Sequence, residues 1–397
     1  MLRVLTLTTL FPDASRPNFG IFVERQTLAL AARGDVSVRV VAPLGIPPWP
    51  LSRLARYRAL SLLPMQERWK GLAVHRPHFP NLPGLGGRSH ALLLARAMTP
   101  VLAAIRGEFP FDLIAAEFFY PDGPAAVALG RHFGVPVSIT ARGSDIHRWG
   151  KAPGVSGQIV AAGQGAAGML AVSEAMRGDM IAMGMPGERI EAIATGVDQV
   201  RFAPRDRVAG KAALGVSGPL VVSLGALIPL KGHDIVIDAV ARLPGVNLWI
   251  AGQGPEQGRL EAQVARLGLG ERVRVLGGVP NEEVAALVAA ADVMALASER
   301  EGLANAWLEA LASGTPVVIP DVGGARQVLR TSAVAGRIAP RTPEGFAAAI
   351  AEVLAESPDP EAVRAVAAPY TWAANSAQLH RFYSRLAAGN GRPAELD

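Results

Sequence analysis

Cysteine is absent from this sequence of 397 residues. Its absence excludes a disulfide scaffold, a thiolate metal site and a cysteine nucleophile, and it fits a reducing compartment. Long hydrophobic runs are missing too, because no uninterrupted apolar stretch reaches the roughly 18 residues that a membrane-spanning helix needs. The opening residues, MLRVLTLTTLFP, have too short an apolar part for a signal peptide and predict a buried first strand. We therefore expect a cytoplasmic protein, at most peripheral on the inner face of the cell membrane.

Acidic residues are scarce in one segment of a chain whose net charge is +5. Between positions 53 and 96 the only acid is Glu67. The cations of that span are Arg53, Arg56, Arg58, Arg68, Lys70, Arg76, Arg88 and Arg96, and apolar and aromatic residues alternate with the first of them. Such a stretch can lie on an anionic membrane surface, but a solvated, arginine-rich connecting region fits equally well. Nucleic acid is not expected as a partner, because no motif for it is present.

The order of apolar segments predicts an α/β protein. Half of the residues are hydrophobic and only 18% are charged, so the chain can bury a large core in two or three domains. The first half predicts strands at 3–8, 36–42, 113–116, 137–140, 169–172 and 190–194, and helices at 22–32, 89–105, 123–133 and 174–183. The second half predicts strands at 220–224, 247–251, 273–276, 293–297, 316–319 and 336–338, and helices at 233–241, 257–267, 281–290, 304–313 and 343–355.

Strands that alternate with helices indicate βαβ units and parallel sheets. We expect two doubly wound, Rossmann-like domains that face each other across a cleft, with ligands at the carboxyl ends of the strands. The polar, loop-like stretch 200–217 is the best boundary. The predicted domains are residues 1–200, joined by a C-terminal helix at 371–390, and residues 201–370.

Three glycines, Gly163, Gly165 and Gly168, match the GxGxxG pattern formally. A dinucleotide fingerprint has to follow a strand and open a helix, whereas this motif follows a helical pattern and precedes a strand. After the first predicted strand the sequence is LFPDASRPNFGIF, which lacks the fingerprint. An NAD-dependent dehydrogenase is therefore disfavoured.

Two glutamates in SEREGLANAWLEALASGTPVV, Glu301 and Glu309, are eight positions apart. In a continuous helix this spacing places the second side chain about 80° round the axis and about 12 Å along it. The amides that open such a helix attract phosphate, so carboxylate, helix end and carboxylate together would suit a sugar, a diphosphate and a ribose. An ordinary helix with an acidic residue in its first turn explains the spacing equally well.

The same segment resembles the E-x7-E signature of the retaining, GT-B-fold glycosyltransferases of family 4. Further segments resemble motifs of that family along the chain. They are TARGSDI at 140–146, TGVD at 195–198, SLGALIPLKGHDIVIDA at 223–239, AGQGPE at 251–256 and LGGVPNEEV at 276–284. The resemblance implies a GT-B fold whose second domain binds the nucleotide-sugar donor and whose C-terminal helix packs back on the first.

The resemblance also implies roles for individual residues, with no metal and no cofactor. Lys231 would neutralise the leaving diphosphate, Glu301 would bind hydroxyls of the transferred sugar, and Glu309 would hold the ribose. The implied donor site further includes Gly20 and Gly225, the amides of Gly302, Leu303, Ala304 and Asn305, and the loop with Gly277 and Val279, which would line the base. The family's reaction retains anomeric configuration.

Two positions depart from the family pattern. Arg142 stands where the family usually has histidine, and Ala226 where it usually has an arginine that clamps phosphate. Arg142 could supply the missing catalytic charge from the opposite domain, or it could anchor its own loop or bind the acceptor. The further candidate acceptor contacts are Asp145, His147, Glu117 and Tyr120.

The leading hypothesis is a retaining glycosyltransferase that moves a sugar from a UDP- or GDP-linked donor to a polysaccharide or glycolipid in cell-envelope or exopolysaccharide synthesis. Its expected partners are the donor, a polysaccharide or lipid-linked acceptor and an anionic membrane surface. Two alternatives stay open: an inactive protein that binds nucleotide sugars, suggested by Arg142 and Ala226, and a sugar-nucleotide epimerase of the same fold.

Overall fold

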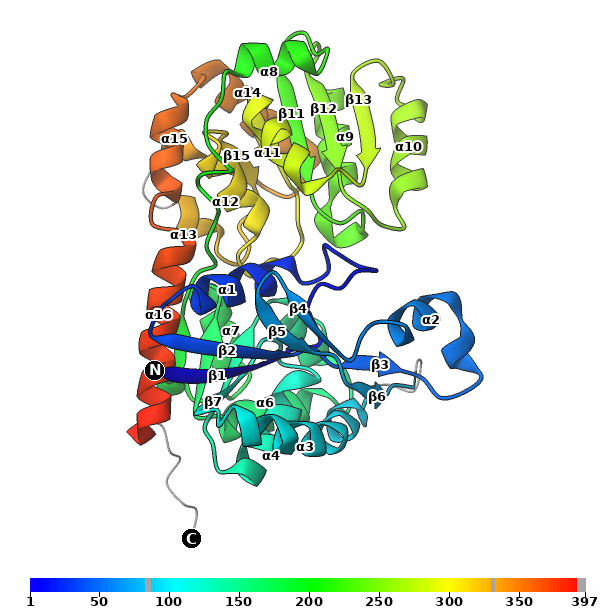
Figure 1. Ribbon diagram of the computed structural model, residues 1–397. Coiled ribbons are helices and arrows are strands. Elements are labelled where there is room, and N and C mark those ends of the chain that lie inside the picture. Colours follow the sequence, from blue (N-terminus) through cyan, green and yellow to red (C-terminus); the bar gives the residue numbers. More distant parts are fainter. Residues whose placement is uncertain (83–86, 330–332, 391–397) are drawn as a thin grey trace. The chain divides into compact units, whose positions relative to one another are not determined.

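The computed structural model describes residues 1–82, 87–329 and 333–390 (Figure 1). The chain forms two compact units. The N-terminal unit consists of Met1–Thr195 together with the chain from Trp372 onward, and the C-terminal unit is Gly196–Thr371. Each unit contains its own sheet, with helices on both faces, so the predicted α/β class with two parallel sheets is confirmed.

In the residues described, the sheet of the N-terminal unit has eight strands. In spatial order they are β10 (Ile190–Ala192), β9 (Gly168–Ala171), β8 (Val137–Ala141), β7 (Leu113–Ala116), β1 (Leu2–Leu7), β2 (Val36–Val41), β5 (Leu72–His75) and β4 (Gln66–Trp69). All neighbours are parallel except β4 and β5. Every residue of β7, β8 and β9 is buried, which explains their continuous apolar sequences: a parallel strand covered on both faces needs no alternation.

Helices cover both faces of this sheet (Figure 1). They are α1 (Ile21–Ala31), α3 (His90–Glu108), α4 (Asp122–Phe133), α5 (Ser144–His147), α6 (Ser156–Gly165), α7 (Glu174–Ala182) and α16 (Trp372–Arg385). The C-terminal helix α16 packs against α1, as expected, and its Leu379 and Phe382 join a buried cluster with Val4 of β1 and Leu113 of β7. The last helical residues, η6 (Leu386–Asn390), follow it directly.

A smaller substructure extends from the same unit. Strands β3 (Leu44–Ile46) and β6 (His78–Pro80) form a parallel pair, and between them the chain forms the short helices η1 (Leu51–Arg53) and α2 (Ala55–Ser61) before β4. Figure 1 shows α2 at the right, beyond β3. None of these elements was predicted from the sequence, because they are short and lack a periodic apolar face.

The sheet of the C-terminal unit is entirely parallel. Its strands lie in the order β13 (Val273–Gly277), β12 (Asn247–Ala251), β11 (Leu220–Leu224), β14 (Val293–Ala295), β15 (Val317–Ile319) and β16 (Gly336–Ile338). Successive strands are added on one side of β11 up to β13, and then on its other side from β14 onward. The topological switch point is therefore between β11 and β14, which is where ligands of such sheets bind.

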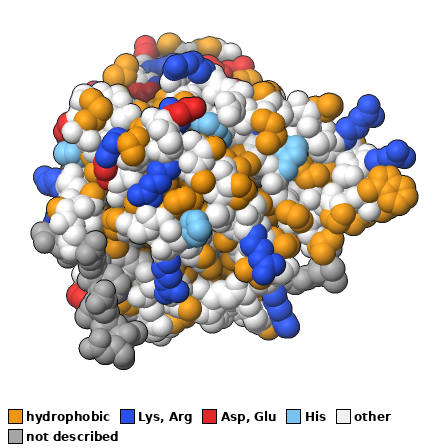
Figure 2. All heavy atoms as spheres, turned by 60° about the horizontal axis from the view of Figure 1, so that its bottom comes forward, with side chains coloured by type: hydrophobic (Ala, Val, Ile, Leu, Met, Phe, Trp, Pro, Cys, Tyr) orange, Lys and Arg blue, Asp and Glu red, His pale blue; other side chains and the backbone are white. Residues whose placement is uncertain are grey.

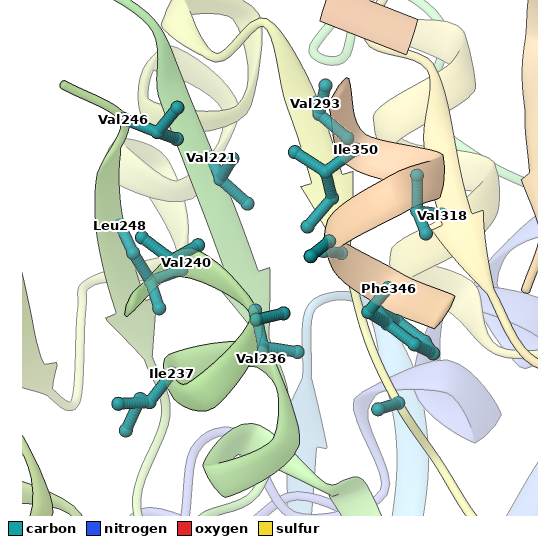
Figure 3. Packing of buried hydrophobic residues seen from close by; sticks show 14 of the residues in the cluster. Val221, Val236, Ile237, Val240, Val246, Leu248, Val293, Val318, Phe346 and Ile350 are labelled. Carbon is teal, nitrogen blue, oxygen red and sulfur yellow. The ribbon is translucent and has the colours of Figure 1, made fainter. Parts of the chain in front are cut away.

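The core of this unit lies between the sheet and helices α9 (His233–Ala241) and α14 (Pro343–Glu356). Figure 3 shows Val236 and Val240 of α9 beside Val221 of β11, and Phe346 and Ile350 of α14 beside Val293 and Val318. The other helices of the unit are α8 (Arg207–Ala213), α10 (Gln257–Arg266), α11 (Asn281–Ala290), α12 (Asn305–Ala312), α13 (Ala325–Leu329) and α15 (Pro360–Ala367).

The segments 200–217 and 163–168 contain regular secondary structure. The stretch 200–217 is not a loop throughout, because α8 occupies part of it and is capped by the Asp206 side chain, which accepts from the Ala209 amide at 2.9 Å. The reading of the GxGxxG pattern is confirmed: Gly163 and Gly165 lie in α6, and Gly168 begins β9. In the described ranges no helix is long and apolar enough to cross a membrane.

Candidate active site

The loops that follow β11 and β14 carry the two main candidates of the C-terminal unit. Lys231 ends the short helix η4 (Pro229–Lys231) after β11, and Glu301 lies on the loop after β14. The Lys231 ammonium donates to Glu301 Oε1 at 2.5 Å, and the Ser298 hydroxyl donates to the same oxygen at 2.7 Å. Both charged side chains are mostly buried, with 20% and 11% exposed. The structure therefore brings together a cation and a carboxylate that are 70 positions apart.

Close backbone approaches hold these loops in place. Gly232 has φ 65°, and a Cβ on it would lie 2.1 Å from the Ala297 carbonyl oxygen. Gly323, after β15, has φ 51°, and its Cβ would lie 2.2 Å from the Glu301 carbonyl oxygen. The next amide, that of Gly324, donates to the Gly302 carbonyl at 2.8 Å. Only glycine fits these two positions, so the backbone that carries Glu301 is held from two sides.

The helix after Glu301 begins within one residue of its predicted start. Helix α12 begins at Asn305, with Ala304 as its N-cap, so Glu301 lies outside the helix. The separation expected for a continuous helix therefore does not apply, and the amides of Gly302 and Leu303 precede the helix. The N-cap residue Ala304 makes no side-chain hydrogen bond to the helix start, and a helix start of this kind suits an anion. Glu309 is the fifth residue of α12 and is half-buried.

The glycine-rich loop after β12 supports the neighbouring loops. A Cβ on Gly252 would lie 1.7 Å from the Gly225 carbonyl oxygen, and the Leu227 amide donates to Gln253 O at 2.9 Å. The Gln253 side chain lies over the backbone of Gly278. Gly278 stands in the sequence between Gly277 and Val279, which are predicted to line the base. The predicted donor residues Gly225, Gly277 and Val279 therefore lie at carboxyl strand ends of one sheet. Ala226 is exposed in the loop after β11.

A buried histidine lies under the Lys231 loop. His233 is 2% exposed, and its Nδ1 is 2.9 Å from the Ser223 hydroxyl of β11. Burial lowers the pKa of His233 to about 4, so the imidazole is neutral at physiological pH. Its Nε2 has no hydrogen-bond partner among the described residues.

In the N-terminal unit Arg142 lies beside a buried carboxylate. Its guanidinium donates to Glu117, which also accepts from the Gln26 amide at 3.2 and 3.1 Å. Only 4% of the Arg142 side chain and 3% of the Glu117 side chain are exposed. Phe22 lies 5.4 Å from the guanidinium carbon. Arg142 thus anchors the loop after β8 to the end of β7 in its own unit; its predicted catalytic role is not tested by this geometry.

Three candidate acceptor contacts also have partners within this unit. Asp145 is fully buried and accepts the amides of Phe119 at 3.0 Å and Gly143 at 2.7 Å, and burial raises its pKa. Tyr120 is 1% exposed and donates to the Gly87 carbonyl. His147 is 2.9 Å from Asp179 and is partly exposed. Asp145 and Tyr120 therefore shape the loops, and contact with an acceptor stays a prediction for all three.

A further carboxylate, Asp122, begins α4 and is completely buried. One of its oxygens accepts the Thr9 amide at 2.8 Å, and the other has no partner in the described structure. Burial, together with the smaller effects of the nearby Asp145 and Glu117, raises the pKa of Asp122 to about 7, although the bonds from Thr9 oppose this shift. The neutral form of the Asp122 carboxyl is thus favoured up to about pH 7.

The local backbone geometry at position 20 requires glycine. Gly20 is the N-cap of α1 with φ 69°, and a Cβ there would lie 2.5 Å from the Leu10 carbonyl oxygen. Its approach to the diphosphate stays a prediction. In the residues described, no group of three or more His, Asp or Glu could hold a metal ion.

Comparison with known families identifies this architecture. The family Glycosyltransferase Family 4 matches residues 20–201, and the family Glycosyl transferases group 1 matches residues 205–368. Together they span almost the whole described chain. The chain belongs to the GT-B glycosyltransferases of family 4. It is therefore a retaining glycosyltransferase of the hexosyltransferase type that uses a nucleotide-sugar donor.

Individual relatives agree with this assignment. A Bacillus subtilis protein named as a teichuronic acid biosynthesis glycosyltransferase, TuaC, is 28% identical over 334 residues, which cover 81% of this chain and 82% of that protein. The D-inositol 3-phosphate glycosyltransferase of Mycolicibacterium gilvum is 34% identical over 212 residues, which are 51% of this chain and 48% of that protein. The chain thus matches this second relative over about half of its length.

Solved structures share the fold of this glycosyltransferase. Sucrose-phosphate synthase from Thermosynechococcus elongatus has a TM-score of 0.80 at 20% identity, over 98% of this chain and 100% of that one. Anabaena HepE, solved with UDP-glucose, has a TM-score of 0.74 at 20% identity, over 97% and 100% of the two chains. At this identity the likeness shows the fold alone.

Sequence reasoning missed three residues of the candidate site. Ser298 and Gln253 lie within recognised motifs but had no assigned role, and Gln26 lies in α1 without any motif. A serine three positions before Glu301 is a signal that could have been used, since a short polar side chain can reach back to a nearby carboxylate. Nothing in the local sequence of Gln26 indicates that it contacts Glu117, 91 positions away.

Proposed function

We propose that this glycosyltransferase moves a hexose from a UDP- or GDP-linked donor to a polysaccharide or lipid-linked sugar of the cell envelope. The observation that carries the proposal is the Lys231–Glu301 pair at the switch point of the C-terminal sheet. A cation and a carboxylate at this position match the two ends of a sugar diphosphate. The cation suits the phosphates, and the carboxylate suits paired hydroxyls.

Lys231 and Glu301 have complementary roles in this mechanism. Glu301 binds hydroxyls of the transferred sugar, while Lys231 turns from Glu301 to the diphosphate as the glycosidic bond breaks. Negative charge then develops on the leaving phosphate, and a positioned ammonium stabilises it. Ser298 keeps Glu301 in place when Lys231 leaves, because its hydroxyl bonds the same oxygen.

The remaining donor contacts come from neighbouring loops. The backbone from Gly302 to Asn305, where α12 begins, is proposed to share the diphosphate, and Glu309 is proposed to bind the ribose. The loop with Gly277 and Val279 would line the base through backbone groups. Gly225 and Gly20 would allow the backbone to approach the donor closely. In the family's reaction the acceptor attacks from the face that the phosphate leaves, and the phosphate takes its proton.

The N-terminal unit is proposed to bind the acceptor. Arg142 is the proposed additional cation, and to act on phosphate its guanidinium would have to share its bond with Glu117. His147 is the best of the acceptor contacts, because it is partly exposed beside Asp179. For Asp145 and Tyr120 the geometry favours positioning of the loops at the ends of β7 and β8.

The proposed acceptor class rests on the relatives and on the surface charge. TuaC is named for teichuronic acid biosynthesis, and a Rhizobium meliloti relative is named as a lipopolysaccharide core biosynthesis glycosyltransferase. Glycans of this kind are assembled at membranes, which fits a peripheral position on the inner face of the cell membrane and the basic span 53–96.

Turnover with defined donors tests the proposal. The purified protein is incubated with UDP- and GDP-sugars and lipid extract from envelope-forming bacteria, and released nucleotide and glycosylated product are measured by mass spectrometry. We expect one donor to be consumed with transfer to a lipid-linked or polysaccharide acceptor. Transfer to neither acceptor class, with release of free sugar alone, would contradict the proposed acceptor.

A further inference from the structure

The substructure around α2 exposes apolar side chains that a folded unit normally buries. Trp49 is 73% exposed and Leu62 is 76% exposed, and Leu51, Leu54 and Met65 are also exposed. Neither η1 nor α2 has a buried residue. We call residues 49–65 the projecting segment. Figure 2 shows hydrophobic side chains with Lys and Arg next to them at the right of the view, where this segment extends from the N-terminal unit.

The charge of the projecting segment has one sign. Arg53, Arg56 and Arg58 are all exposed, and no acidic residue occurs between positions 36 and 66. The next acid along the chain, Glu67, pairs with Arg76 at 2.5 Å, and Arg76 is itself buried. Lys70 pairs with Glu24. Of the eight cations of the basic span, Lys70 and Arg76 are therefore paired, and the three arginines of the projecting segment lie beside its exposed apolar residues.

The arrangement of these side chains suits a bilayer interface. Leu54, Arg58 and Leu62 are spaced by four and lie along one side of α2 and its two caps. Arginine can extend its charged end to headgroups while its stem stays in an apolar layer, and tryptophan prefers the same depth. Leucine on either side of Arg58 would enter the acyl boundary.

We propose that the projecting segment docks this glycosyltransferase on an anionic lipid bilayer, with Trp49, Leu54 and Leu62 inserted and the three arginines on lipid phosphates. The proposal commits to lipid because the charge is wholly positive and is mixed with leucine and tryptophan, which complements an anionic headgroup layer. It deepens the proposed function, since it rests on a membrane-held acceptor for its role. Its test measures lipid binding and not turnover, so the two can fail independently.

The absence of cysteine allows a direct measurement at single positions. Leu62→Cys is labelled with an environment-sensitive dye and mixed with vesicles of phosphatidylglycerol and phosphatidylcholine, or of phosphatidylcholine alone. We expect a blue shift with the anionic vesicles at low salt only, because about 1 M salt shortens the screening length to about 3 Å. The same dye on Val208→Cys, an equally exposed position in α8 (77%), should not shift.

Flotation with the same vesicles measures separately how much the arginines and the apolar side chains contribute to lipid binding. Replacing Arg53, Arg56 and Arg58 by Gln should lower the partition coefficient on the order of 100-fold, since each basic residue contributes about a factor of five. The matched control replaces the exposed Arg205, Arg266 and Arg326 by Gln, with the same change in charge, and should bind normally. Trp49→Ser with Leu62→Ser should weaken binding about tenfold, whereas Val200→Ser with Val208→Ser should not.

Two results would overturn the proposal. One is a wild-type protein that does not float with anionic vesicles at low salt, with no dye shift at Leu62→Cys. The other is binding that falls equally in the arginine variant and in its matched control, which would indicate nonspecific charge. The dye at Leu62→Cys could also shift with an added protein and with neither vesicle preparation. That result would assign the projecting segment to a protein partner and would reject the lipid proposal.

Discussion

Lys231 Nζ lies 2.5 Å from Glu301 Oε1, across the switch point of the C-terminal sheet. The two residues come from loops that follow adjacent strands, β11 and β14, and their backbones are fixed by Gly232 and Gly323. A mostly buried ion pair of this kind keeps both charges in place before a ligand arrives. In the proposed mechanism the donor exchanges this one contact for two, one with its phosphates and one with its sugar hydroxyls.

Removal of the ammonium tests the role of Lys231 in leaving-group stabilisation. We expect Lys231→Ala to lower kcat about 100- to 1,000-fold, because a single positioned donor to a developing charge is worth that much. Discrimination between sugars should change little, since Glu301 and Ser298 remain. The measurement is steady-state kinetics on two donors. Wild-type kcat in this variant would show that the lysine has no part in the transfer.

Glu309 is the second residue whose role can be tested directly. Glu309→Gln should reduce the thermal stabilisation given by UDP or GDP, because an amide replaces one of the two acceptors that paired ribose hydroxyls need. A tenfold weaker Kd would reduce the stabilisation by about 1.4 kcal/mol at saturating nucleotide. Glu282→Gln, on the exposed first turn of α11, is the matched control. Equal nucleotide-induced shifts in both variants would remove Glu309 from the ribose site.

The sequence predicted the sheets better than the contacts of the site. Parallel strands covered on both faces are continuous apolar runs, so β7, β8 and β11 could be placed to within about one residue. The antiparallel pair of β4 and β5, and helix α2, were missed because an edge strand and an exposed seven-residue helix have no such run.

The sequence motifs predicted which residues belong to the candidate site, but not which residues these side chains contact. The Lys231–Glu301 and Arg142–Glu117 pairs join positions 70 and 25 residues apart, and strand order decides which loops meet. The start of α12 after Ala304 was placed to within a residue, so Glu301 lies before the helix and the separation calculated for a continuous helix does not apply to it. The roles of these residues in catalysis stay predictions.

Gly323 should be needed for the position of Glu301. Gly323→Ala brings a Cβ to 2.2 Å from the Glu301 carbonyl oxygen at a left-handed φ of 51°, so the Glu301 loop must move. We expect a clear loss of kcat together with lower stability. The matched control is Gly268→Ala, at φ 66° with open space around it, which should lose about 1 kcal/mol of stability from backbone strain alone and keep its activity. Equal activity of both variants would contradict the role of Gly323.

The Arg142–Glu117 pair should be a strong determinant of stability in the N-terminal unit. Glu117→Gln leaves a buried guanidinium without its counter-charge and should reduce the free energy of unfolding by about 3 kcal/mol. The control, Glu108→Gln, breaks an exposed pair with Arg39 and should lose less than about 1 kcal/mol. Denaturant unfolding measures both changes. Similar losses would mean that the buried pair is solvated in solution.

Asp122 and His233 should give opposite dependences of stability on pH. Burial lowers the pKa of His233 to about 4 in the native state, whereas the pKa in the unfolded chain is about 6.5. Between these two pH values the unfolded chain binds a proton that the native state does not bind. The stability due to neutral His233 is therefore present above pH 6.5 and is lost as the pH falls towards 4. His233→Gln should lose this acid sensitivity, so its melting temperature should gain on that of the wild type as the pH is lowered.

The contribution of Asp122 to stability changes with pH in the opposite direction. Its pKa is raised to about 7 in the folded state, whereas the unfolded chain releases the proton near pH 3.9. The native state thus holds an extra proton between these values, and stability falls as the pH rises from about 4 to about 7, by about 4 kcal/mol in total. Asp122→Asn keeps the acceptor for the Thr9 amide but cannot ionise, so its melting temperature relative to the wild type should rise over this range. A difference that does not change with pH would show that the pKa of Asp122 is not raised in the folded protein.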